Sequence, residues 1–152
     1  MDNVAIVQRF VEELWNNRQL DTADEIFAPH CITHQLRSGE PITSEPRDPE
    51  TLKQHIREWV KAFPDLQFTL EQTIANGDRV ASQMTMHGTH TAEWMGVSPT
   101  GKRISIAIIT VHRIEEGKIV EDWVLVDSLG FFQQLGLVAS REDICPRQLE
   151  SM

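Results

Sequence analysis

The sequence predicts an α+β domain in which N-terminal helices pack on one face of a cone-shaped, curved antiparallel sheet. Up to residue 63, apolar residues recur every three or four positions, which is the helical period. Beyond residue 64 they alternate with polar residues, and turn signals separate the runs, as in hairpin-linked strands. Helices followed by strands favour a helical layer on a sheet, and the open end of a cone forms a pocket.

Three helices are expected in the first half of the chain. They cover residues 2–17, 21–27 and 49–63. Asp2 or Asn3 can cap the first helix, and Asp48 followed by Pro49 is a typical start for the third. Residues 31–34 form a short β-type run, and the Ser-, Gly- and Pro-rich loop at 37–48 is long enough to be a lid or rim.

Four strands are expected in the second half, near residues 66–70, 79–91, 102–114 and 118–127. Asn76-Gly77, Pro99-Thr100-Gly101 and Glu116-Gly117 supply the turns between them. A last helical turn is expected at 129–135, ended by Gly136. Residues 1–138 are therefore expected to form one domain, and residues 139–152 a loose C-terminal tail.

Composition limits the class of partner. The formal net charge is −9, which disfavours nucleic acid and anionic membranes, so a small hydrophobic molecule or a second copy of the chain is the expected partner. We expect no metal, because neither HxH, HExxH nor CxxC occurs. Cys31 and Cys145 are expected to be free thiols in a reducing compartment. With no apolar run of membrane-spanning length and no signal-peptide pattern at the start, the expected location is the cytoplasm.

The stretch 117–127 carries the first candidate for acid/base chemistry. On a regular strand, Trp123, Leu125 and Asp127 share one face. A carboxylate among apolar neighbours suits proton transfer near neutral pH, because desolvation disfavours its charged form. Alternatively, Asp127 caps the helical turn that begins at Ser128. Both interpretations are open at the level of sequence.

Histidines are further candidates, because imidazole titrates near neutral pH. His34 lies in the short run after the second helix, and His90 ends a strand. Each is also explained as a hydrogen-bonded core or rim residue. His87 and His90 face opposite sides of a regular strand, so they are not expected to be joint ligands.

The pair Trp94-Met95 runs directly into a Gly- and Pro-rich turn, where large apolar side chains are hard to bury. Such residues line a pocket mouth or a subunit contact. The other tryptophans and most methionines are explained by core packing.

Several segments together resemble the SnoaL-like polyketide cyclases, or ester cyclases, within the group that shares the fold of nuclear transport factor 2 and ketosteroid isomerase. The matching segments are residues 88–90, 94–102, 113–123 and 134–136, together with Asp127. The resemblance implies a cystatin-like α+β barrel and a cofactor-free enzyme that closes a ring of an aromatic polyketide by an intramolecular aldol step.

The resemblance also implies site residues. The family's catalytic aspartate falls on Asp127 by the Trp-x-x-x-Asp spacing, and two further polar positions fall on His34 and His90. The residues expected to bind the substrate are Trp59, Gln83, Trp94, Met95, His112 and Trp123. We expect Trp123 and Asp127 to face the interior of the pocket, with His34 and His90 within reach.

Three functions remain open at this stage. They are a cyclase or isomerase acting on a hydrophobic carbonyl compound, a non-catalytic binding module, and a hydrolase or dehydratase using the same pocket. A homodimer is also expected, because the strand near 104–114 has apolar residues on both faces, more than one side of a small sheet can bury.

Overall fold

The computed structural model of the protein describes residues 2–37, 39–145 and 147. Its elements in chain order are α1 (Asn3–Arg9), η1 (Phe10–Asn16), α2 (Thr22–Ile26), β1 (Phe27–Leu36), β2 (Thr43–Pro46), α3 (Pro49–Ala62), β3 (Gln67–Asn76), β4 (Arg79–Thr89), β5 (Arg103–Glu115), β6 (Lys118–Val126), α4 (Ser128–Gln134) and α5 (Arg141–Ile144). The predicted α+β class is confirmed.

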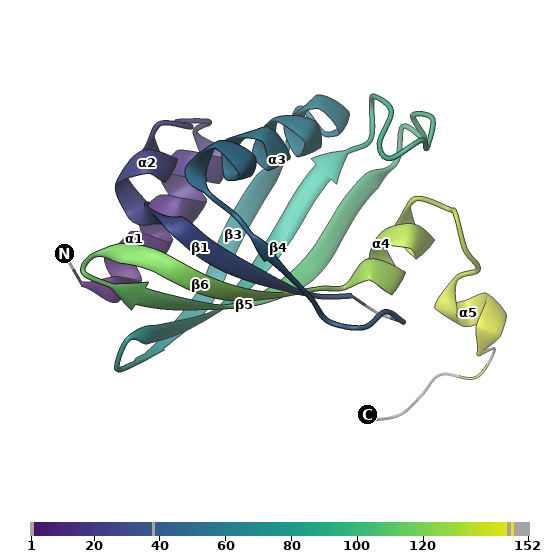
Figure 1. The fold of residues 1–152 in the computed structure, drawn as a ribbon. Helices are drawn as coiled ribbons and strands as arrows, with labels where there is room; N and C mark the ends of the chain where they lie inside the picture. Colours follow the sequence, from purple (N-terminus) through teal and green to yellow (C-terminus); the bar gives the residue numbers. More distant parts are fainter. Residues whose placement is uncertain (1, 38, 146, 148–152) are drawn as a thin grey trace.

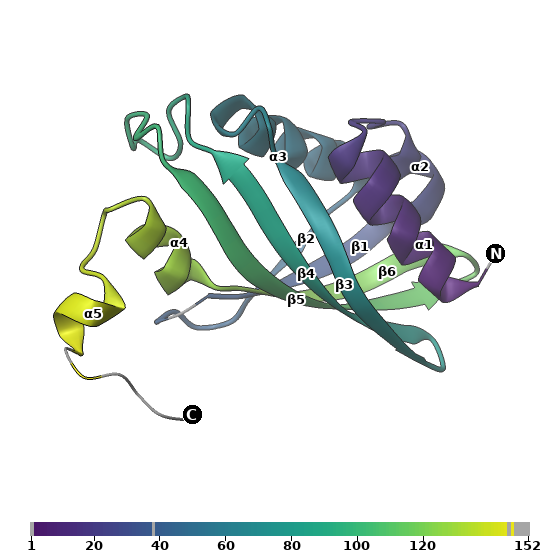
Figure 2. The same cartoon turned by 180° about the vertical axis from the view of Figure 1, so that it is seen from behind.

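The six strands form one curved sheet in the order β2-β1-β6-β5-β4-β3. All neighbouring strands pair antiparallel except β1 and β6, which run parallel. The pairing of β1 with β6 departs from the antiparallel sheet expected from the sequence, because these two strands are far apart in the chain and no hairpin connects them. The sheet also does not close into a barrel, since β2 and β3 are its two edges. Helices α1, α2 and α3 lie against one face of this sheet (Figures 1 and 2).

The N-terminal helix is not uniform along its length. The Asp2 side chain accepts a hydrogen bond from the backbone N–H of Ala5, so the predicted cap is present. From Phe10 onward the chain winds as a π-helix, and the N–H of Asn17 bonds to the carbonyl of Glu12, five residues back. Such wide turns often occur near functional sites, and here the widened segment carries Phe10 and Trp15 over the sheet.

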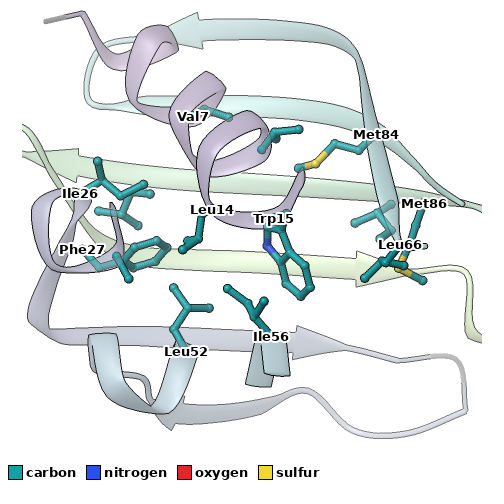
Figure 3. Close-up of a cluster of buried hydrophobic side chains, with 14 of the residues drawn as sticks. Val7, Leu14, Trp15, Ile26, Phe27, Leu52, Ile56, Leu66, Met84 and Met86 are labelled. Carbon is teal, nitrogen blue, oxygen red and sulfur yellow. The ribbon is translucent and has the colours of Figure 1, made fainter. Parts of the chain in front are cut away.

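The core lies between these helices and the inner face of the sheet. Figure 3 shows Val7, Leu14 and Trp15 from the N-terminal helix meeting Ile56 of α3 and Met84 of β4. All five side chains are buried. Burying a Leu- or Ile-sized side chain stabilises a fold by about 1.5–3 kcal/mol. The buried side chains of this layer therefore hold the helices against the sheet.

A bulge in β6 decides which residues of that strand face inward. Ile114 of β5 pairs with Ile119 and Arg113 pairs with Glu121, so Val120 is an extra residue in the ladder. Ile119 is buried on the inner side, but beyond the bulge the alternation is reversed and Asp122 is the inward residue. The expected grouping of Ile119 with Trp123 on one face therefore fails.

The chain after β6 leaves the sheet. α4 lies beyond the end of β6, and α5 follows it (Figure 1). The expected loose tail at 139–152 contains a short helix, because Ser140 and Asp143 form a reciprocal capping box; residues 146 and 148–152 of that tail lie outside the described residues. Within the described ranges, no helix is both long and apolar enough to cross a membrane.

Candidate active site

A cavity of about 770 Å³ opens between the inner face of the sheet, α3 and α4. Its wall is mostly aromatic and aliphatic. Trp59 of α3, Trp94 of the β4–β5 loop and Phe131 of α4 meet there, with ring centres 5.0 to 5.6 Å apart. An aromatic wall of this kind suits a fused-ring ligand, since aromatic rings attract one another in offset or edge-on arrangements.

Three buried polar residues form a row across the inner face of the sheet. Asp122 on β6 lies opposite Thr33 on β1 and opposite His112 on β5. Each has one side-chain atom with no hydrogen-bond partner among the described residues: Thr33 Oγ1, Asp122 Oδ1 and His112 Nε2. Leaving a buried polar atom unpaired costs about 1–3 kcal/mol. Asp122 and His112 also line the cavity, whereas Thr33 lies behind its lining, so the first two mark a polar site within an apolar cavity.

His112 is fixed within this row. Its ring meets the ring of Phe10 edge-on at 5.0 Å, and Nδ1 lies 3.5 Å from Thr110 Oγ1. Burial lowers the pKa of His112, and the negative charge of Asp122 only partly opposes this effect. The imidazole is therefore neutral near pH 7. When the Thr110 hydroxyl donates to Nδ1, the ring proton lies on Nε2, the atom closest to Asp122.

His55 on α3 also lines the cavity. Its ring meets Trp15 edge-on at 6.1 Å. Burial lowers the pKa of His55 to about 4, and the positive charges of Arg47 and Arg37 add to the effect. The cavity lining therefore contains two neutral imidazoles at neutral pH, His55 on α3 and His112 on β5.

His90 lies outside the cavity lining but holds part of its rim. It is fully buried and stacked on Phe63, with ring centres 5.3 Å apart. Its Nδ1 accepts a hydrogen bond from the backbone N–H of Thr100, and its own backbone bonds to Lys102 and Gly101. These bonds tie the two ends of the loop that carries Trp94. His90 is thus buried beneath this loop rather than in the cavity lining, and its Nε2 has no hydrogen-bond partner among the described residues.

The expected inward position of Asp127 is wrong. Asp127 is exposed, is absent from the cavity lining, and accepts a hydrogen bond from the N–H of Gly130 at 2.9 Å. It is the N-cap of α4, which is the alternative that the sequence left open. The physical reason is the period of β6: Asp122 faces inward, so a residue five positions later faces outward.

Trp123 and His34 also lie on the outer face, contrary to expectation. Their rings stack with centres 5.0 Å apart. His34 bonds through Nε2 to Glu121 and through Nδ1 to Ser44, both at 2.7 Å. The bond to His34 is the main cause of the lowered pKa of Glu121. This outer cluster is closed by partners within the sheet and does not reach the cavity.

The six residues expected to bind substrate divide into two groups. Trp59, Trp94, Met95 and His112 line the cavity, whereas Gln83 and Trp123 do not. Gln83 accepts a hydrogen bond from Gln72 on the neighbouring strand, away from the cavity. Met95 is 81% exposed, so it lies at the mouth.

Sequence reasoning missed two residues of the cavity lining, Asp122 and His55. The sequence does contain one feature that points to Asp122. Asp122, Val124 and Val126 are spaced by two, so on a strand they share a second face that is also apolar. No sequence signal distinguishes which of the two faces packs inward. In the part of the chain that the structure describes, no group of three or more His, Cys, Asp or Glu side chains could hold a metal ion.

The family model of the SnoaL-like polyketide cyclases matches residues 5–135. The chain belongs to this family, which has the fold of nuclear transport factor 2. It is 28% identical over 139 residues to the aklanonic acid methyl ester cyclase AcmA of Streptomyces galilaeus, covering 89% of this chain and 91% of that protein.

Solved structures agree with this assignment. IdmH, a putative polyketide cyclase from Streptomyces antibioticus, superposes with a TM-score of 0.77 at 29% identity, covering 90% of this chain and 99% of that one. AclR, a putative hydroxylase from Streptomyces galilaeus, superposes with a TM-score of 0.76 at 28% identity, covering 92% and 84%. These two structures carry different activity names on one fold, so the site itself must decide the chemistry.

Proposed function

We propose that the protein is a cofactor-free cyclase that closes a carbon ring of an aromatic polyketide-type ketone, with Asp122 as the general base. The observation that carries this proposal is the pair of Asp122 and His112, which lie opposite each other on β6 and β5, line the aromatic cavity and each have an unpaired polar atom. Asp122 thereby takes the role that the sequence assigned to Asp127.

The chemistry requires a base and a hydrogen-bond donor on the same substrate. Asp122 removes a proton from the carbon α to a ketone, and the electron pair moves onto the ketone oxygen as an enolate. The Nε2–H of neutral His112 donates a hydrogen bond to that oxygen. The 4.0 Å between Nε2 and the Asp122 Oδ2 leaves the donor free for the substrate.

Ring closure then returns the proton. The α-carbon attacks a second carbonyl of the same molecule, a carbon–carbon bond forms, and the new alkoxide takes the proton held by Asp122. The step is an aldol addition and is redox-neutral, so its atoms and electrons balance within the substrate. The cavity contributes by holding the flexible substrate in a conformation that places the two reacting carbons close together.

The relatives suggest the first substrate to try. AcmA is named for aklanonic acid methyl ester, and a fused-ring ketone of that kind matches the wall formed by Trp59, Trp94 and Phe131. Turnover of this ester, or of another enolisable aromatic polyketide, is the primary assay.

The decisive comparison is Asp122→Asn against Asp127→Asn. Both changes replace a carboxylate by an amide, but only the first lies in the cavity. We expect Asp122→Asn to lower kcat by about a hundredfold or more, because the proton acceptor is lost while much of the shape is kept. Asp127→Asn should retain most turnover, since Asn is also a good helix cap.

The opposite result, with Asp127→Asn inactive and Asp122→Asn active, would overturn the assignment of the base. Equal turnover in the wild type and Asp122→Asn would exclude acid/base catalysis by this residue. Tight binding of an aromatic product analogue without turnover of any enolisable ketone would favour the binding-module alternative.

A further inference from the structure

One arginine of the cavity lacks the partners that similar arginines have. Four arginines are half-buried among the described residues: Arg9, Arg18, Arg47 and Arg113. Arg9 and Arg113 each bind two glutamates, and Arg18 binds backbone carbonyls of Trp15 and Leu66. Within the described residues, the Arg47 guanidinium has neither a carboxylate within 4.0 Å nor a hydrogen-bond partner, yet it lines the cavity.

The backbone holds Arg47 on the inner side of the sheet. It follows β2 directly, and its N–H donates to the carbonyl of Cys31 on β1 at 2.7 Å. Cys31 is fully buried on the same inward-facing series as Thr33 and Gln35. Because Arg47 lies beside Cys31 in this extension of the β1–β2 pairing, its side chain is on the same face as that of Cys31, toward the cavity. The next residue, Asp48, caps α3.

The other charges of the lining do not neutralise Arg47. Glu40 lies 4.0 Å from Arg37 and is exposed, and Glu58 and Glu93 are also exposed. Charges in contact with water are strongly screened. His55, which the positive charge of Arg47 reaches, is neutral at pH 7 and adds no negative charge. Asp122 is the buried carboxylate of the same lining, but it forms no ion pair with Arg47 within 4.0 Å. Among the described residues, the Arg47 guanidinium therefore has no carboxylate in contact with it.

We propose that Arg47 binds an anionic oxygen substituent of the ligand, either a carboxylate or an ionised enol or phenol, on a fused aromatic ring. A guanidinium presents planar N–H donors that match such oxygens, and charge-assisted bonds are about twice as strong as neutral ones. The aromatic wall takes the ring system while Arg47 orients its acidic edge. This inference rests on the proposed function only in taking the cavity as the substrate site.

The test measures binding rather than turnover, so that the two proposals fail separately. Isothermal titration calorimetry compares two pairs of probes: 2-naphthoate with its methyl ester, and 2-hydroxy-1,4-naphthoquinone with its 2-methoxy ether. The first pair differs in a carboxylate and the second in an ionised enol. In the wild type we expect the anionic member of at least one pair to bind about tenfold to a hundredfold more tightly, in the range of a charge-assisted hydrogen bond.

Arg47→Gln should abolish this preference while leaving affinity for the neutral member of each pair unchanged. Arg47→Lys keeps the charge without the planar fork, so a partial preference is expected. Arg79→Gln is the matched control, because Arg79 lies over the outer-face Trp123 ring at 5.0 Å and should have no effect. Melting temperature verifies folding of each variant.

Equal binding of anionic and neutral probes by the wild type would overturn the inference, as would a preference that survives in Arg47→Gln. The carboxylate pair and the enol pair distinguish the two sources of the anionic oxygen. Tighter binding of an anionic probe that depends on Arg47 supports the inference even if Asp122→Asn is fully active. If the anionic probes show no such preference, loss of turnover in Asp122→Asn does not restore the inference.

Discussion

His112 Nε2 lies 4.0 Å from Asp122 Oδ2, while the other ring nitrogen of His112 lies 3.5 Å from Thr110 Oγ1. The distance to Asp122 is too long for a hydrogen bond. The two groups are therefore neighbours that do not satisfy each other's hydrogen-bonding capacity, and both line the cavity. This relationship distinguishes the pair from the closed outer cluster of His34 and Glu121, which are bonded at 2.7 Å.

Removing the donor should be less severe than removing the base. We expect His112→Gln to lower turnover about tenfold to a thousandfold, because one donor to the enolate oxygen is lost and a water can partly replace it. His87→Gln is a suitable control, since His87 lies outside the cavity lining. Steady-state kinetics with an enolisable polyketide measures both, and unchanged kcat in His112→Gln would remove His112 from the mechanism.

Asp127 should matter for stability. Asp127→Ala removes the cap of α4 and should lower the free energy of unfolding by about 0.5–2 kcal/mol, whereas Asp127→Asn should change it by a few tenths of a kcal/mol. Urea denaturation followed by circular dichroism measures the difference. A fall of equal size in both variants would mean that the carboxylate charge, rather than its hydrogen bond to Gly130, stabilises the helix.

Stability should decrease in mild acid because of His55. Its pKa in the folded protein is about 4, below the ordinary value of 6.5. The unfolded chain therefore binds a proton near pH 6.5 that the folded protein does not bind until about pH 4. Stability from this group is present above the unfolded pKa and is lost as pH falls, by about 2 kcal/mol between pH 7 and pH 5.

The control for this pH dependence is His55→Phe, which keeps the ring packing against Trp15 but cannot bind the proton. The difference in unfolding free energy between pH 7 and pH 5 should shrink by about the same 2 kcal/mol in this variant. Chemical denaturation at the two pH values measures it. An identical pH dependence in the wild type and His55→Phe would contradict the assignment to His55.

The outer sheet face is the expected dimer contact. Leu125 and Ile109 are paired across β6 and β5 and are 47% and 43% exposed, and Ile32 is 43% exposed on β1. We expect a dimer of the 17.4 kDa chain in sedimentation at tens of micromolar. Leu125→Lys should shift it to monomer, and Ile144→Lys, on exposed α5, should not. A monomer in the wild type would contradict the expectation.

The sequence by itself determined the class of the fold and most of its elements. The three- and four-residue spacing placed the N-terminal helices and α3, and the Asn76-Gly77 and Glu116-Gly117 turns separated the strands where the structure has them. These features are local: a cap, a turn or a period depends on neighbours within a few residues. The parallel pairing of β1 with β6 is not local, because its partners are about 90 positions apart in the chain and nothing near either strand encodes it.

Only the tertiary structure decided which acid belongs to the site. Both faces of β6 carry apolar residues, Trp123 and Leu125 on one and Val124 and Val126 on the other, so the alternation is compatible with either packing. After the bulge at Val120, the face of β6 that carries Asp122, Val124 and Val126 points toward the helices and the cavity. Asp122 then lies opposite His112 of β5. The face of a strand that is buried depends on what packs against it, and for β6 those partners come from the other half of the chain.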